Sequence, residues 1–450
     1  MRILQKVLIK PGSLGKRLIK AGGWSIGGKV ASQGLQLVSN LIMTRLLVPE
    51  AFGLMALVTT VIVAANLTSD MGIEQSIVRE KDGDSDFFLR VAWTTKIMRG
   101  AAMAAGVLLV ALTIAAASSI LAIGDTAYAD PRLPWLLILA AFAPLMAGLE
   151  STKKELATRH LEFSRIIRID LGAQIISMGT MIAFASISPT VWALTTGLLI
   201  GRLTNTIASH LVLPGPKMAL VWDAAIASRL WHFGKWLIGS SSFHFIAMHG
   251  DRVILGALVN TGTFGVYSIA RIWITAMQQL IQVVTGKLGF SAIGEVVRNR
   301  PKDVKQVFRK FQMVVDVLCF VSFLGLFFIG PTFIRTLYPT DYILAADSIS
   351  VLALGLLVER FKTLGQLSSN IGNSRAAMYI SLIRAATLCI SLPFAFDAFG
   401  LEGALYAVVL SPLVSVPYAL SAVRSLLGWQ IAIDAGWVIA ILLAALATVL

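Results

Sequence analysis

The sequence predicts an all-α polytopic membrane protein with two six-helix lobes and an additional C-terminal span. Three observations support this fold class. The composition is too apolar for a soluble domain, thirteen apolar runs approach or exceed the length of a membrane-spanning helix, and a short motif recurs in the second half of the chain. The two lobes are expected to be related by a pseudo-twofold axis along the membrane normal.

The composition alone excludes several classes of protein. Of the 450 residues, 56% are hydrophobic and only 14% are charged, and the mean hydropathy is +0.79. Average soluble domains carry about 25% charged residues. A cytosolic enzyme, a secreted disulfide scaffold and a disordered chain are therefore excluded. Cys319 and Cys389 lie in apolar runs without metal-binding spacing, so we expect packing roles for them and no metal site.

The apolar runs give the candidate spans, because a helix needs about 20 mostly apolar residues to cross a bilayer. They are residues 22–48, 51–69, 91–117, 134–149, 169–187, 190–213, 236–258, 264–286, 311–329, 343–358, 376–396, 403–423 and 435–450. In residues 1–10, apolar side chains at positions 3, 4, 7 and 8 are accompanied by Lys6 and Lys10, which predicts an amphipathic helix on an anionic membrane surface. The last run reaches Leu450 without a polar flank, so we expect a short span or a chain that continues further.

The basic residues predict the orientation of these spans, because Lys and Arg collect on the cytoplasmic side. With the N-terminus inside, twenty-eight of the 38 basic residues fall in cytoplasmic segments, and only Arg132 and Arg335 fall in outer loops. A single missed span would destroy this asymmetry. The formal net charge of +14 therefore indicates membrane topology and gives no support to nucleic-acid binding.

An internal repeat relates the two halves of the chain. Residues 24–27 and 236–239 share the pattern Trp-x-Ile-Gly, and Phe52-Gly53 recurs as Phe264-Gly265 at the same offset of 212 positions. Six spans precede the second copy, so both copies cross the membrane in the same direction. Parallel repeats are typical of alternating-access transporters with a central site. The alternative is a coincidence between apolar sequences.

The runs and the repeat together predict five segments. They are a basic cytoplasmic N-terminus at 1–21, an N-lobe of spans one to six at 22–213, a cytoplasmic linker at 214–235, a C-lobe of spans seven to twelve at 236–423, and an extra C-terminal span at 424–450.

Basic residues inside the spans are the first candidates for a site, since each costs about 2.5–3.5 kcal/mol at a helix centre and must snorkel, pair or face a wet cavity. The structural alternatives are snorkelling for Lys96 and Arg99 and a pair with Glu50 for Arg45. The candidates for binding substrate are Lys29, Arg202, Arg252, Arg271 and Arg384. For these five, helix packing and ion pairing remain open as alternatives. Lys29 shares a helix with Gly23 and Gly27, which let a ligand or another helix approach closely.

Titratable residues at the same depth are the candidates for ion coupling or gating. They are Asp170, Asp251, Asp316 and His244. Structural pairing or packing is the alternative for each. His244 and His249 are five positions apart, which gives no shared metal-binding face. Three carboxylates cannot neutralise eight cations, so the predicted cavity carries a surplus of positive charge.

A cationic cavity favours an anionic cargo. The planar guanidinium of Arg binds phosphate through two hydrogen bonds, which points to a phosphate-bearing cargo. A carrier of cationic drugs would need carboxylates instead. A membrane glycosyltransferase or polymerase would need catalytic carboxylates or a sizeable outer domain, and the outer loops of this chain are short.

Residues 46–54 and 70–78 resemble the opening motifs of bacterial oligosaccharide flippases, the polysaccharide transporter family of the multidrug/oligosaccharidyl-lipid/polysaccharide exporter superfamily. Residues 251–256 and 264–267 are similar to the start of the second lobe in that family. Within these motifs we expect turn and packing roles for Pro49, Glu50, Gly53 and Gly72.

The resemblance implies twelve to fourteen spans and no cofactor. It implies translocation of undecaprenyl-pyrophosphate-linked oligosaccharide repeat units across the bacterial inner membrane for export of exopolysaccharide, O-antigen or capsule. Lipid-linked oligosaccharide and membrane lipids are then the partners, with a polysaccharide polymerase and glycosyltransferases acting in the same process. An ion-coupled drug or metabolite antiporter of the same superfamily is the alternative. For the flippase with a cationic cavity, reversing the charge of Lys29, Arg202 or Arg252 is expected to abolish transport.

Overall fold

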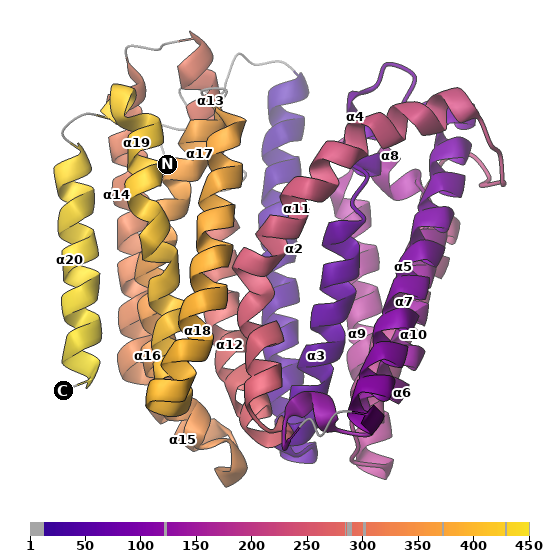
Figure 1. The fold of residues 1–450 in the computed structure, drawn as a ribbon. Coiled ribbons are helices and arrows are strands. Elements are labelled where there is room, and N and C mark those ends of the chain that lie inside the picture. The colour runs from indigo at the N-terminus through magenta and orange to yellow at the C-terminus, as the bar shows by residue number, and fades with distance from the viewer. Residues whose placement is uncertain are drawn as a thin grey trace. The chain divides into compact units, whose positions relative to one another are not determined.

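The computed structural model describes residues 13–120, 124–283, 285, 290–299, 303–370, 373–427 and 430–449. The described residues form helices and their connections and contain no β-strand, which confirms the predicted all-α class (Figure 1). The amphipathic helix predicted for residues 1–10 lies outside the described residues.

The chain divides into two compact units. Unit 1 comprises Met1–Leu46, Val61–Ile120 and Pro131–Gly239, and unit 2 comprises Leu47–Thr60, Leu121–Asp130 and Ser240–Leu450. The segments 47–60 and 121–130, which the sequence assigns to the N-lobe, thus pack with unit 2. The predicted linker also has contacts of its own, because Ile226 and Leu230 join a buried cluster with Phe88 and Leu89 in unit 1.

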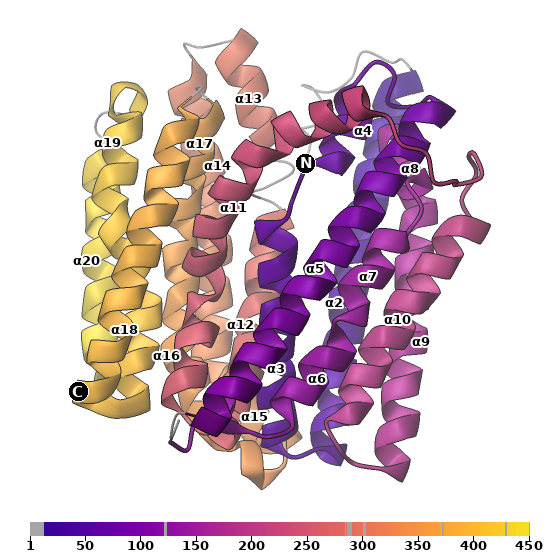
Figure 2. The ribbon, with the colours of Figure 1, turned by 45° about the vertical axis from the view of Figure 1, so that its right-hand side comes forward.

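Unit 1 is a bundle in which α2, α9, α10, α7 and α5 pack successively against one another (Figure 2). Its helices are α2 (Ser13–Leu46), α4 (Ile73–Arg79), α5 (Asp86–Ile120), α6 (Leu133–Ala140), α7 (Phe142–Leu149), α8 (Lys153–Arg159), α9 (Phe163–Ile187) and α10 (Trp192–Leu211). Two helices have residues in both units, namely α3 (Pro49–Thr68) and α11 (Ala224–Leu258).

Unit 2 is built around α16, whose side chains are mostly buried and which contacts α12, α14, α15, α18 and α20. Its α-helices are α12 (Thr261–Gln282), α13 (Phe290–Asn299), α14 (Val304–Leu324), α15 (Gly330–Leu337), α16 (Leu344–Val358), α17 (Lys362–Asn370), α18 (Ser374–Leu410), α19 (Val416–Leu427) and α20 (Gln430–Val449). Short turns of 3-10 or π-helix join them at η4 (Gly325–Ile329), η5 (Thr340–Tyr342), η6 (Glu359–Phe361) and η7 (Ser411–Ser415). Another 3-10 turn of unit 2, η1 (Ala127–Ala129), lies between α5 and α6 in the chain.

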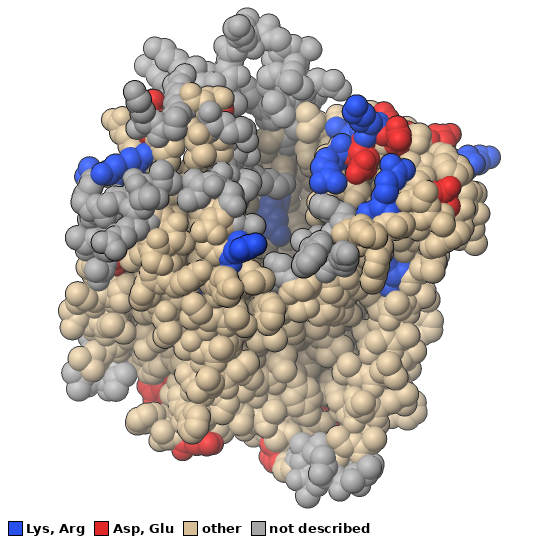
Figure 3. Space-filling model, turned by 45° about the horizontal axis from the view of Figure 1, so that its top comes forward, with Lys and Arg blue, Asp and Glu red and all other residues tan. Residues whose placement is uncertain are grey.

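Each predicted span coincides with helical structure, but the number of membrane crossings stays a prediction. Six described helical segments are long and apolar enough to span a membrane, or seven if the bent pair Leu133–Leu149 and Lys153–Arg159 is one span. Helix α2 is more polar, with Gln33 and Asn40 buried. On the face shown in Figure 3, most charged side chains lie near its upper and lower parts, and uncharged side chains cover most of the area between them, as expected for a surface that faces lipid.

The internal repeat is visible in the helix boundaries. Helix α2 ends at Leu46 and α3 begins at Pro49, while α11 ends at Leu258 and α12 begins at Thr261, again 212 positions later. The offset inferred from a few motif residues therefore also relates the turn between α2 and α3 to the turn between α11 and α12. This agreement supports a true repeat over a coincidence.

The two equivalent glycines of the repeat pack directly against each other. A Cβ atom on Gly53 would collide with the Thr261 carbonyl oxygen, and a Cβ on Gly265 would collide with the Pro49 carbonyl oxygen. Pro49 and Thr261 are themselves equivalent, so the contact is reciprocal, as it is across a twofold axis. The packing role expected for Gly53 is confirmed, and the contact supports the predicted pseudo-twofold relation.

The second motif glycine has the expected turn role. Gly72 has φ 62° and ψ 33°, a left-handed conformation that glycine adopts without strain, and it precedes α4. Its N–H donates to the Asp70 side chain at 3.0 Å. The Asp-x-Gly motif therefore builds a turn.

Candidate functional site

Unit 2 contains a polar cavity of about 300 Å³. Helices α11, α12, α16 and α18 supply most of its wall, together with Glu359 from η6 and Lys362 from α17. Its charged and titratable lining residues are His244, His249, Asp251, Arg252, Arg271, Glu359, Lys362 and Arg384. The structure thus brings together three predicted substrate residues, Arg252, Arg271 and Arg384, with the predicted coupling residues Asp251 and His244.

One of these cations is neutralised inside the cavity. The Nε atom of Arg271 lies 3.0 Å from Oδ2 of Asp251, which is 2% exposed. The hydroxyl of Tyr267 donates to the same carboxylate oxygen. Asp251 therefore pairs with a residue one helix away and not with its neighbour Arg252. The ion-pair alternative holds for Arg271.

A second cation is also paired. The Nζ atom of Lys362 lies 2.7 Å from Oε2 of Glu359, and Nε2 of Gln278 donates to Oε1 of Glu359 at 2.9 Å. Sequence reasoning missed Lys362 because the sequence assigns it to a cytoplasmic segment. The structure places it in the cavity because α17 begins directly after η6, where the chain is still inside the bundle.

Arg252 and Arg384 are the lining cations that form no ion pair with any described carboxylate. Arg384 donates from Nε to Oγ of Ser415 at 3.1 Å and lines the cavity. Four cations and two carboxylates line the cavity, so two positive charges are uncompensated with both His side chains neutral. This confirms, for unit 2, the predicted surplus of positive charge.

The cavity also contains polar atoms without a hydrogen-bond partner among the described residues. They are Nδ1 of His249, Oδ1 of Asp251 and Oε1 of Gln279. Buried polar groups are normally satisfied, so such atoms at a cavity indicate where water or a ligand binds. The cavity therefore offers acceptors beside its cations, which suits a ligand with hydroxyl groups as well as anionic oxygens.

The remaining candidates from the sequence lie elsewhere. Lys29 and Arg202 are exposed side chains of α2 and α10 in unit 1. Asp170 accepts from Nζ of Lys154 at 2.8 Å and from Nδ2 of Asn205 at 2.8 Å, so its structural alternative holds. Lys29 and Arg202 stay predictions as substrate residues.

Unit 1 has its own network of charged side chains. Lys154 also donates to Glu150 at 2.8 Å, and Lys96 donates to Glu155 at 2.7 Å. Lys96 is therefore ion-paired, whereas the sequence favours snorkelling. Arg99 is bound as well, since it donates to the carbonyl of Asn66 at 2.9 Å. The carboxylates that neutralise Lys96 and Lys154 come largely from the segment after α7, which the sequence assigns to a cytoplasmic loop.

This network predicts an acid-sensitive unit 1. Burial opposes ionisation of Glu150, but Lys96 and Lys154 outweigh it and hold the pKa of Glu150 below its usual value of 4.5. The resulting stabilisation is present above that value and is lost as the pH falls through the lowered pKa. We expect Glu150→Gln to lower stability by about 1–2 kcal/mol near neutral pH and to flatten the acid decline of the melting temperature. The exposed Glu402→Gln is the control; equal acid profiles for both variants would contradict this.

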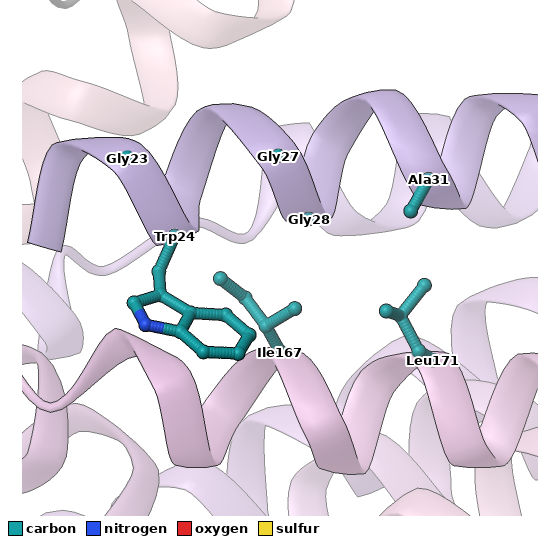
Figure 4. A pocket seen from close by; sticks show the side chains of 7 residues that line it. All are labelled: Gly23, Trp24, Gly27, Gly28, Ala31, Ile167 and Leu171. Carbon is teal, nitrogen blue, oxygen red and sulfur yellow. The ribbon is translucent and has the colours of Figure 1, made fainter. Parts of the chain in front are cut away.

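An apolar groove of about 440 Å³ lies between α2 and α9 in unit 1 (Figure 4). It is lined by Gly23, Trp24, Gly27, Gly28, Ala31, Ile167 and Leu171. A Cβ at Gly23 or Gly27 would meet no atom within 4 Å, so the missing side chains keep this space open. The glycine-rich face of α2 therefore lines a groove, as its small residues suggest, but Lys29 is not among the lining residues.

Sequence reasoning also missed a buried arginine. Arg360, assigned from the sequence to a cytoplasmic segment, is 1% exposed. Its Nε donates to Asp316 at 2.7 Å and its Nη1 donates to Asp434 at 2.7 Å. Asp316 is therefore held in an ion pair and does not line the cavity. In the sequence, Asp434 could have indicated a buried partner for Arg360, because it is an acidic residue at the edge of the last apolar run.

Comparisons with known proteins agree with this architecture. A model of the polysaccharide biosynthesis protein family matches residues 42–347. The lipopolysaccharide biosynthesis protein WzxC of Escherichia coli (strain K12) is 24% identical over 380 residues, which cover 82% of this chain and 72% of that protein. The succinoglycan biosynthesis transport protein ExoT of Rhizobium meliloti (strain 1021) is 22% identical over 414 residues, 90% of this chain and 80% of that protein.

Solved structures share the fold. The lipid II flippase MurJ in an inward closed conformation gives a TM-score of 0.70 at 14% identity, with 94% of this chain and 91% of that chain covered. An inward-facing multidrug resistance MATE transporter of the MOP superfamily gives 0.63 at 12% identity, covering 88% and 95%. The chain therefore has the same fold as these two transporters.

Proposed function

The chain belongs to the polysaccharide biosynthesis protein family, and we propose that it flips lipid-linked oligosaccharide repeat units across the membrane. The cargo is an oligosaccharide on undecaprenyl pyrophosphate, destined for exopolysaccharide, O-antigen or capsule. The names of WzxC and ExoT, which concern lipopolysaccharide biosynthesis and succinoglycan transport, support this assignment.

The cationic cavity of unit 2 is the observation that carries the proposal. Arg252 and Arg384 reach it from α11 and α18, and neither is neutralised by a described carboxylate. A diphosphate has oxygens on two phosphorus atoms, so each guanidinium can bind one phosphate through paired hydrogen bonds. A volume of about 300 Å³ suits a head group, while the polyprenyl chain stays in the lipid.

The antiporter alternative is less well supported. The MATE structures share the fold, and a cationic drug would need free carboxylates in the cavity. Both lining carboxylates are occupied, Asp251 by Arg271 and Glu359 by Lys362. A cationic drug would have to displace Arg271 or Lys362 from its carboxylate. It would still be repelled by the positive charges of Arg252 and Arg384.

The proposed setting is the bacterial inner membrane, with the N-terminus in the cytoplasm. The distribution of Lys and Arg between loops supports this orientation. Glycosyltransferases then supply the lipid-linked repeat unit on the cytoplasmic side, and a polysaccharide polymerase consumes it outside. Flipping proceeds by alternating access, in which the cationic site faces first one side of the membrane and then the other.

Binding of prenyl phosphates to the purified full-length chain tests the proposed function. Farnesyl pyrophosphate is expected to bind at least about tenfold more tightly than farnesyl monophosphate, because the second phosphate adds charge-assisted hydrogen bonds of about 1.5–3 kcal/mol each. Farnesol has no phosphate, so it measures the contribution of the prenyl group alone and is expected to bind weakest. In cells, deletion of the protein is expected to cause accumulation of lipid-linked repeat units. Equal binding of farnesol and farnesyl pyrophosphate would contradict the proposal.

A further inference from the structure

A buried arginine of unit 2 lies between two carboxylates, next to the cavity but outside it. Nε and Nη2 of Arg360 donate to Asp316 at 2.7 and 3.2 Å, and Nη1 donates to Asp434 at 2.7 Å. The guanidinium also lies over the ring of Trp437, 5.0 Å from its centroid. These groups come from η6, α14 and α20. We call Asp316, Arg360 and Asp434 the Arg360 triad.

The two carboxylates of the triad are not equivalent. Asp316 accepts a further hydrogen bond from Nε2 of Gln312 at 3.0 Å, in addition to the two from Arg360. Asp434 accepts only from Nη1, and its Oδ2 is buried with no partner among the described residues. One arginine balances one carboxylate, and Asp316 holds it through two bonds. The negative charge of Asp434 is therefore the least compensated in the triad.

We propose that Asp434 binds the proton that is coupled to cargo movement. With both carboxylates ionised the triad has a net charge of −1, and a single proton makes it neutral. Arg360 donates to both carboxylates and lies between them. Oδ2 of Asp434 is the buried triad oxygen without a partner among the described residues, so it is the atom that would take the proton.

Among the described residues, Asp434 contacts the charged side chain of Arg360 from η6, and Asp316 from α14 shares that arginine. The next charged residues along the chain, Glu359 and Lys362, line the cavity instead. The proton site thus has its own surroundings, distinct from the two histidines and the Asp251–Arg271 pair of the cavity.

One short segment connects this proton site to the cavity. The turn η6 places Arg360 in the triad and the adjacent Glu359 in the cavity wall. Ionised Asp434 adds negative charge beside an anion site, so protonation is expected to strengthen diphosphate binding. By reciprocity, diphosphate binding then promotes proton uptake. This coupling rests on the proposed function, because it assumes a diphosphate cargo.

The pH dependence of farnesyl pyrophosphate binding to the full chain tests the proton site. We expect wild type to bind about fivefold or more tightly at about pH 6 than at about pH 8, the lower end of typical coupling between sites. Asp434→Asn mimics the protonated carboxyl, so it is expected to lose most of this difference and bind well at both values. Asp434→Glu keeps a titratable group and is expected to retain it.

Asp347→Asn is the matched control. Asp347 forms an exposed ion pair with Arg335 near the start of α16, whereas Arg360 of the triad follows the end of that helix. The probe also titrates, so the decisive quantity is the difference between wild type and Asp434→Asn. A dye assay in weak buffer measures proton uptake on binding and should show less uptake for Asp434→Asn alone. Unchanged pH dependence in Asp434→Asn would overturn the proton site while leaving the flippase intact. No binding by wild type would overturn the proposed function and the proton site together.

Discussion

Reversing the charge of Arg252 or Arg384 is expected to abolish transport while the protein still reaches the membrane. Each guanidinium is a lining cation of the unit 2 cavity without a described carboxylate partner. Its replacement by Glu removes hydrogen bonds to the diphosphate and adds repulsion. The combined loss is about 3 kcal/mol or more, which corresponds to at least about a hundredfold weaker binding. Polysaccharide production in a flippase-null strain and farnesyl pyrophosphate binding measure the effect.

Three controls separate a binding defect from a folding defect. Lys217→Glu makes the same kind of change at an exposed residue of unit 1 and is expected to complement normally. Arg252→Lys keeps the charge but loses the planar guanidinium that binds phosphate through two hydrogen bonds, so we expect partial activity. Membrane levels by immunoblot should match wild type. Normal complementation by both Arg252→Glu and Arg384→Glu would refute the cationic site.

Replacing Gly265 by Ala is expected to cause the largest loss of stability from a single methyl group. The new Cβ would collide with the Pro49 carbonyl oxygen, which is backbone and has little freedom to move, and would lie 3.2 Å from the backbone nitrogen of Gly53. Overpacking of this kind costs about 3 kcal/mol. The melting temperature should therefore fall by about 3 °C. Gly53→Ala is expected to act in the same direction, because the contact is reciprocal.

Gly34→Ala is the matched control for this pair. A Cβ at Gly34 would meet no atom within 4 Å, and the residue lies within α2. There Ala is the better helix former by about 1 kcal/mol, so the melting temperature should stay the same or rise. Similar melting temperatures for Gly265→Ala and Gly34→Ala would show that the close crossing of α3 and α12 does not exist.

The fold class was predictable because its signals are local. Apolar runs and turn glycines act over a few residues, and the repeat needs only two short motifs. The turn after α2 and its counterpart after α11 therefore follow from the pattern around Phe52 and Phe264. Ion pairs between distant elements could not be predicted in the same way. Lys96, Arg271 and Asp316 are each ion-paired with a residue of another element, and the pattern of a single helix does not record such a partner.

The sequence by itself determined that this chain is an apolar helical bundle with an internal repeat and an excess of buried cations. Only the tertiary structure decided which cations stay uncompensated. Arg360 and Asp434 are 74 positions apart and still form one ion pair, because packing of distant helices places them side by side. Ion pairing depends on a few ångströms between such elements, and no periodicity in the chain records that distance. The same packing places Arg252 and Arg384 in the wall of the unit 2 cavity without a described carboxylate partner.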